Sequence, residues 1–192
     1  MKHRLFITLA LQVLLVSSGA AAVVTHAWKF GDGSTYEVAL PDGAQIEQVS
    51  PPEDTAHQAF TIHMPDEAGI STIACQLMVM RAEPADKWAD LGKVDAFLHK
   101  AGQRGLQGAV ETEIHPVHLS MANGVASYIV FTDASLVGKT IDRPGEFRHM
   151  IMLAGRVRDF TIFARGYTNS TESDYFNAMN RMIESPRIIA PE

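Results

Sequence analysis

The chain has 192 residues, of which 46% are hydrophobic, and its 22 acidic against 16 basic side chains give a formal net charge of −6. An acidic surface of this kind repels phosphate backbones and anionic head groups, which argues against nucleic acid and anionic lipid as partners. The single cysteine excludes an internal disulfide framework.

The first 22 residues, MKHRLFITLALQVLLVSSGAAA, have the three parts of a secretory signal peptide. Lys2 and Arg4 make a basic start, an apolar run follows from Leu5 to Val16, and the segment ends in three alanines. We therefore predict a signal peptide over residues 1–22, cleaved after Ala22. The apolar run is shorter than the roughly 20 residues that span a bilayer, so no stable membrane insertion is expected after cleavage.

Cleavage after Ala27 is the alternative, because a small residue also stands there. With the first cut, residues 23–192 form the mature chain, and the loss of two basic residues changes its charge to −8. No cysteine lies near the cut to carry a lipid. We expect a soluble, single-domain protein that is periplasmic or secreted.

Alternating and apolar segments predict five strands in the first half of the chain, at residues 28–30, 35–40, 44–49, 57–64 and 70–80. The first two flank Gly31-Asp32-Gly33 and should form a hairpin. The fifth is apolar almost throughout, as expected of a central strand covered on both faces. Cys75 lies within it and is expected to be a buried, unreactive side chain.

Two helices are predicted, one in the middle of the chain and one near its end. Pro84-Ala85-Asp86 suits the start of the first, which should end at residues 102–108. Thr171 begins the second, which stops at Ser185-Pro186. Their apolar faces contain Trp88, Leu91, Val94, Phe97, Leu98 and Ala101 in the first helix, and Tyr175, Phe176, Met179, Met182 and Ile183 in the second.

The segment between the helices predicts two more hairpins. One joins residues 110–119 to 125–132 through Asn123-Gly124, and the other joins 147–153 to 160–165. The sheet should therefore be largely antiparallel. The link from Asp133 to Glu146 is long for an irregular connection, and loops of that length are often functional or mobile.

Two histidines in EIHPVHL, His115 and His118, raise the question of a metal site. Side chains share a strand face at spacing two and a helix face at spacing four, so a spacing of three fits neither. Pro116 breaks the segment further, and Glu113 supplies at most one more ligand. A strand irregularity is the favoured interpretation, with Pro116 marking an edge strand, because proline removes a ladder donor. We predict no metal ligand and no cofactor.

The stretch DASLVGKT, from Asp133 to Thr140, resembles a phosphate-binding loop but lacks its essential parts. The first position holds an acid rather than glycine, and Pro144-Gly145 soon after cannot continue a helix. Asn169-Ser170-Thr171 matches the N-glycosylation pattern, which is short and common. No serine stands in a recognisable nucleophile setting, so no catalytic residue is predicted.

The order of elements resembles the PsbP-like fold, which is shared by photosystem PsbP proteins, the Ran-binding Mog family and the bacterial periplasmic DcrB proteins. This resemblance rests on TYEVALPDG (residues 35–43), on the helix ADKWADLGKVDAFLHKAGQ and on FTIFARGYTNSTESDYFNAMNRMIESPRI. It implies an α+β fold, a single-domain α/β/α sandwich whose largely antiparallel sheet is flanked by two main helices. It also implies a role in binding or assembly rather than catalysis.

Three functions remain open at this point. The first is an exported, non-enzymatic protein of the cell envelope that acts by protein–protein binding or assembly with an unknown envelope partner. The second is a carrier of a small ligand or metal, which would use the sandwich interior or the loop of His115 and His118. An uncharacterised hydrolase is the third.

Overall fold

The computed structural model describes residues 23–30, 33–49, 57–65, 71–84, 86–121, 123–141, 143, 145–172, 176–177, 180–182 and 186–189. The predicted signal peptide, residues 1–22, lies outside these ranges.

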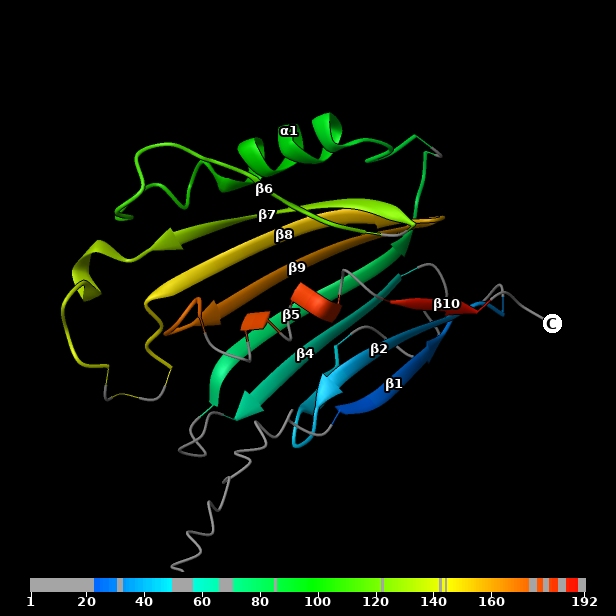
Figure 1. Ribbon diagram of the computed structural model, residues 1–192, viewed down its shortest axis with the longest axis horizontal. Helices are drawn as coiled ribbons and strands as arrows, with labels where there is room; N and C mark the ends of the chain where they lie inside the picture. Colours follow the sequence, from blue (N-terminus) through cyan, green and yellow to red (C-terminus); the bar gives the residue numbers. More distant parts are fainter. Residues whose placement is uncertain are drawn as a thin grey trace, which may run out of the picture.

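A seven-stranded sheet forms the centre of the molecule (Figure 1), and every neighbouring pair of its strands is antiparallel. Its spatial order is β3-β4-β5-β9-β8-β7-β6. The strands are β3 (Gln45–Gln48), β4 (His57–Pro65), β5 (Ser71–Arg81), β6 (Val117–Leu119), β7 (Gly124–Thr132), β8 (His149–Val157) and β9 (Phe160–Thr168).

A second, three-stranded sheet has the order β1-β2-β10. The strands β1 (Val23–Lys29) and β2 (Thr35–Pro41) form the predicted hairpin, which is longer than expected because pairing begins at Val23. The short strand β10 (Arg187–Ile189) pairs with the other edge of β2. The sequence did not predict this second sheet.

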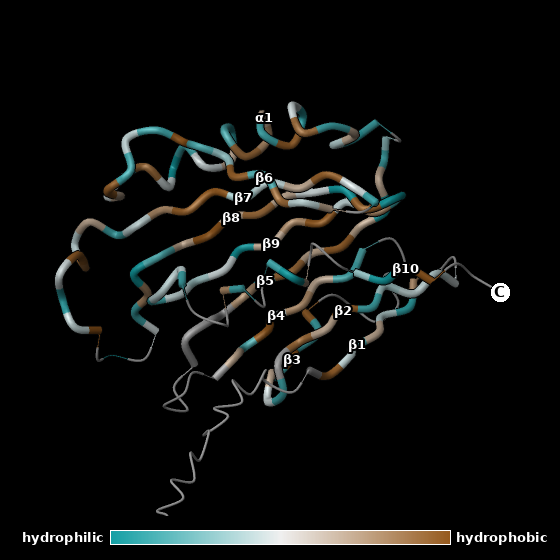
Figure 2. The backbone as a smooth tube through the Cα atoms, in the orientation of Figure 1, coloured by the Kyte–Doolittle hydropathy of each residue, from teal (hydrophilic) through white to brown (hydrophobic). Residues whose placement is uncertain are grey.

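The main hydrophobic core lies between the two sheets. Alternate residues of the central strands face it, as period-two patterning requires. In the tube of Figure 2 the apolar residues of these strands are brown. The tyrosine Tyr36 of β2 is fully buried there, and Trp28 of β1 stacks on Phe60 of β4 with 4.0 Å between ring centroids. Phe176 and Met182 close the core from the carboxyl-terminal segment.

The helix α1 (Leu91–Gly102) covers the opposite face of the large sheet over β7 and β8. Its Val94 and Leu98 are fully buried and pack in a second apolar cluster that contains Ile129 and Met152. The helix therefore covers one half of this face. The β3-β4-β5 half carries the exposed Gln76 and other polar or partly exposed side chains.

The first helix starts later than the sequence predicted. Leu91 is its first residue and Asp90 its N-cap, whose side chain accepts a hydrogen bond of 2.9 Å from the backbone N–H of Lys93. The segment that contains Pro84 forms turns instead. Trp88 is buried as expected, but it lies before the helix at a positive φ of 52°, and its ring packs against Phe97 at 4.6 Å.

Two other expectations need correction, and a third is described only in part. Of the strand expected at residues 110–119, only 117–119 is a strand, because proline and turns precede it. The strand β5 is buried on its Cys75, Leu77 and Val79 face, whereas Met78 on its other face is only half-buried. The expected second helix lies partly outside the described residues, and within them 176–177 and 180–182 are helical.

The fold is α+β and rich in sheet, with two sheets and few helices. The expected sandwich with two flanking helices is only loosely matched, because one face of the large sheet is covered by another sheet as well as by helical residues. In the part of the chain that the structure describes, no helix is both long and apolar enough to cross a membrane.

Candidate functional site

The structure separates the two histidines of EIHPVHL. The His118 Nε2 atom lies 2.9 Å from Asp95 Oδ2 on α1, whereas His115 Nε2 lies 3.7 Å from Glu113 Oε2, with both side chains largely exposed. Within the described ranges, no group of three or more His, Cys, Asp or Glu side chains gathers as metal ligands would. Pro116 directly precedes β6, which is an edge strand of the large sheet as the proline suggested.

An acid and a histidine pair between α1 and β6, with a serine opposite the histidine on β7. His118 pairs with Asp95 as above, and its register partner on β7 is Ser127, whose side chain points to the same face of the sheet. Such a set is typical of nucleophilic catalysis. However, Ser127 is fully buried, so no substrate reaches its hydroxyl. The pair of Asp95 and His118 connects the helix to the edge strand instead.

A second polar cluster lies where β6 has ended and β7 continues. Glu111 accepts two hydrogen bonds from Thr132, at 2.7 Å from its backbone N–H and at 2.8 Å from its hydroxyl. Because the hydroxyl proton goes to Glu111, Thr132 Oγ1 accepts from His149 Nδ1, 3.1 Å away. The Glu111 carboxylate therefore satisfies the backbone N–H of Thr132, which no strand of the described residues pairs with at this point.

The environment of this cluster shifts two pKa values. Burial raises the pKa of Glu111, but the two hydrogen bonds from Thr132, a further backbone hydrogen bond and the nearby His149 lower it, and the net shift is downward. Burial, followed by the nearby charge of Arg148, lowers the pKa of His149. The cluster therefore holds a carboxylate and a neutral imidazole at neutral pH.

The long link after β7 does not bind phosphate in the way of a P-loop. Asp133 caps a single 3-10 turn, η1 (Ala134–Leu136), and its Oδ1 accepts a hydrogen bond of 2.8 Å from Ser135 N–H. Hydrogen bonds from Ser135 also lower the pKa of Asp133, which keeps the acid charged. A negative charge at this position opposes an anionic ligand.

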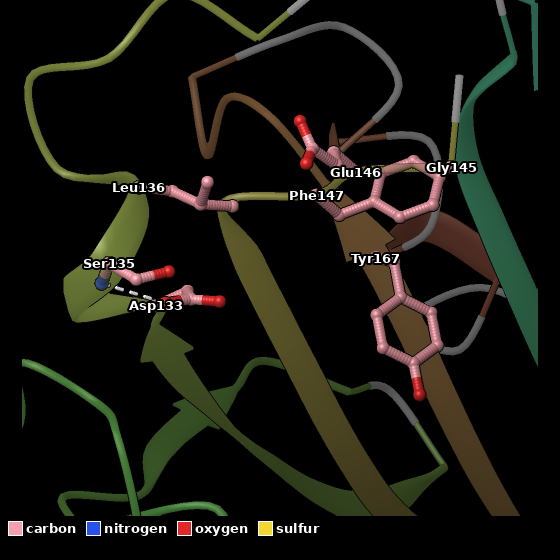
Figure 3. A pocket seen from close by; sticks show the side chains of 7 residues that line it. All are labelled: Asp133, Ser135, Leu136, Gly145, Glu146, Phe147 and Tyr167. Atoms are coloured by element: carbon pink, nitrogen blue, oxygen red, sulfur yellow. Dashed lines mark hydrogen bonds between the residues drawn. The ribbon is translucent and has the colours of Figure 1, made fainter. Parts of the chain in front are cut away.

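The same link forms one wall of an open depression of about 560 Å³ at the end of β7, β8 and β9. Figure 3 shows Asp133 and Leu136 on one side, facing Phe147 and Tyr167 on the other. The two aromatic rings lie 5.8 Å apart and are inclined by 37°. The depression also contains Ser135, Gly145 and Glu146. Most of its residues belong to the link from Asp133 to Glu146, which the sequence indicated as a candidate functional loop. The sequence did not indicate the aromatic pair.

Asn169 holds the aromatic wall of this depression in place. Its Oδ1 accepts a hydrogen bond of 2.8 Å from Arg148 N–H, and its Nδ2 donates to the carbonyl of Glu146 at 3.2 Å. The amide of the N-glycosylation pattern therefore has a structural use in this loop.

The lone thiol, that of Cys75, is fully buried in the main core, as the sequence predicted. Burial raises its pKa to about 12. Because the thiolate is the reactive form, the thiol is inert in the folded protein.

No protein-family model matches this sequence, and no curated protein matches it. Among solved structures, the chain is similar to the solution structure of cyanobacterial PsbP (CyanoP) from Synechocystis sp. PCC 6803, at 17% identity and a TM-score of 0.48 over 92% of this chain and 99% of that one. It is also similar to the crystal structure of LpqN, which is involved in cell envelope biogenesis of Mycobacterium tuberculosis, at 13% identity and a TM-score of 0.46 over 86% and 91%. The first of these structures is of a PsbP protein, the family that the sequence resembles, whereas the likeness to DcrB stays a prediction.

Proposed function

We propose that this is an exported, non-enzymatic protein of the cell envelope that binds another protein through the depression beside Phe147 and Tyr167. The observation that carries the proposal is this half-buried aromatic pair, which forms one wall of the depression opposite Asp133 and Leu136. Aromatic side chains are enriched at protein interfaces and supply much of the binding energy there. A loop next to a rigid sheet end is also where recognition residues usually lie.

Export is supported by the signal-like residues 1–22 and by the position of β1. A cut after Ala22 leaves all of β1, which begins at Val23, whereas a cut after Ala27 removes most of the strand that pairs with β2. The pairing therefore favours the first cut. Sequencing the amino terminus of the protein recovered after export tests this choice.

The binding proposal is tested by comparing variants that differ only at the depression. Phe147→Ala and Tyr167→Ala should each weaken capture of an envelope partner by about ten-fold or more, as expected for aromatic anchors. Val137→Ala is the matched control, because Val137 is an exposed apolar residue of the same loop that does not line the depression. Equal capture by all three variants would contradict the proposal.

A small-ligand carrier is the second candidate, because the volume of the depression is within the range of ligand pockets. Native mass spectrometry of the purified protein distinguishes the two. A bound molecule that is lost in Tyr167→Ala would favour the carrier, whereas an unmodified mass together with aromatic-dependent capture would favour the protein partner.

A further inference from the structure

The two sheets have four edge strands, and an edge strand presents unpaired N–H and C=O groups to any other strand. Proteins protect such edges with short strands, prolines and charges. Three of the four edges here are protected in these ways. The fourth is β1.

The protected edges are all short. The strand β6 has three residues and follows Pro116, and Glu111 takes the N–H of Thr132 beyond it. The strand β10 also has three residues and begins with the charged Arg187. The strand β3 has four residues, and Glu47 is charged and exposed on it.

In contrast, β1 is a seven-residue strand whose register with β2 runs unbroken from Val23 to Lys29. It contains no proline and no acid, and its only lysine stands at the end. In the described part of the chain, no strand pairs with its outer edge. The stacking of Trp28 on Phe60 holds the strand against the core, so the edge is already ordered for pairing.

The residues of β1 are arranged symmetrically around His26. Thr25 and Ala27, on either side of it, are small and exposed, and Val24 and Trp28 are both apolar. If the β1 strands of two copies pair in antiparallel orientation with His26 facing His26, then Thr25 of each copy lies opposite Ala27 of the other. Val24 of each copy likewise lies opposite Trp28 of the other. Each small, exposed residue thus faces a small, exposed one, and each apolar residue faces an apolar one, which is the self-complementarity that a two-fold interface requires.

We propose that β1 pairs with β1 of a second copy of this chain, in antiparallel orientation about a two-fold axis at His26. The pairing joins the two small sheets into one six-stranded sheet across the axis. Figure 1 places β1 at the opposite end of the molecule from η1, so the dimer leaves the depression open. The dimer therefore neither needs nor hinders the proposed function.

The first test changes charge at the two exposed positions that face each other. Thr25→Asp with Ala27→Asp creates two like-charge pairs across the axis, whereas Thr25→Asp with Ala27→Lys creates two opposite-charge pairs. Sedimentation of the exported protein over a concentration series should show dimerisation of the wild type. The like-charge variant should dissociate about ten-fold more readily than the opposite-charge variant.

The second test uses the axis itself. His26→Cys places two thiols opposite each other, and mild oxidation should give a disulfide-linked dimer, while the buried Cys75 stays reduced. Thr25→Cys is the matched control and should give far less, since its facing residue is Ala27. Thermal unfolding checks that each variant keeps the wild-type fold.

Several results would overturn the proposal. They are a wild type that sediments as a monomer at every concentration, equal dissociation of the two charge variants, or equal disulfide formation by His26→Cys and Thr25→Cys. A dimer that responds to Glu47→Lys on β3 rather than to the β1 variants would assign the interface to another edge. Phe147→Ala should not affect the dimer, so a failure here is distinct from a failure of the proposed binding function.

Discussion

The Glu111 side chain accepts a backbone hydrogen bond that a neighbouring strand would otherwise accept. It accepts the N–H of Thr132 at the point where β6 no longer covers the edge of β7, and the same threonine then accepts from His149. Each of these side chains depends on the next, so protonation of one changes the bonds of the others. The cluster therefore makes stability depend on pH.

The pKa values of both ionisable members are lowered in the folded state, so both should make the protein less stable in acid. As pH falls below the usual value for histidine, the unfolded chain binds a proton before folded His149 does, and stability is lost. Glu111 contributes stability at pH values above the usual range of a glutamate, and this contribution is lost as pH falls through its lowered pKa.

Urea unfolding from pH 7 to pH 4 should show a smaller loss of unfolding free energy in His149→Gln and in Glu111→Gln than in the wild type. An unchanged pH dependence in both variants would contradict this role.

For single residues, the sequence predicted which side chains are buried better than which side chains are in contact. The burial of Cys75 and Trp88 follows from the apolar residues around them, and the position of Pro116 from its missing N–H. The partners of His118 and Glu111 could not be predicted, because each lies about twenty residues away on another element, α1 or β7. The aromatic pair of the depression was missed for the same reason.

The helix α1 begins at the capping residue nearest to its apolar stripe rather than at the earlier proline. Pro84 and Asp86 suit a first helical turn, but Asp90 supplies the cap that is formed, immediately before the apolar stripe begins at Leu91. Asp86 instead makes an exposed ion pair of 2.8 Å with Lys93. Pairs of this kind contribute little to stability.

The two acids before α1 should therefore differ on substitution. Asp90→Ala leaves a helix N–H without its partner and should lower the free energy of unfolding by about 1 kcal/mol. Asp86→Ala is the matched control and should have little effect, because its ion pair is solvated. Chemical denaturation of both variants measures the difference. A larger loss in Asp86→Ala would show that the helix is capped elsewhere.

Strands and hairpins were predicted well where alternation and turn residues agree. The β1-β2, β6-β7 and β8-β9 pairings all follow from short connections between alternating segments. The residues before β6 were predicted wrongly because their composition alternates although they form turns. Tertiary hydrogen bonds, including that of Val110 N–H to Thr132 O at 2.8 Å, satisfy their backbone instead.

At the scale of the whole molecule, the division into two sheets could not be predicted. Residues 35–40 alternate in the same way whether they join one sheet or the other. The choice is made by partners from the far end of the chain, since β10 pairs with β2 and Tyr36 donates a hydrogen bond of 3.4 Å to the carbonyl of Met182. Contacts of this range leave no local trace in a sequence.

The strand β10 should contribute to stability through one of two neighbouring isoleucines. Ile188 is partly buried against the main core, whereas Ile189 is exposed. Ile188→Ser should lower the free energy of unfolding by about 1–3 kcal/mol, because apolar area is lost from the core. Ile189→Ser should change it by less than about 0.5 kcal/mol. Equal effects on thermal unfolding would show that β10 does not dock as described.

The position of β2 between β1 and β10 makes the small sheet depend on both ends of the described chain. The β1-β2 hairpin joins neighbouring segments, whereas Arg187 pairs with Glu37 from near the carboxyl end. A two-stranded hairpin is marginally stable alone. A chain that lacks residues 187–189 should therefore leave one edge of β2 open to proteases, and limited proteolysis of such a truncated protein measures this.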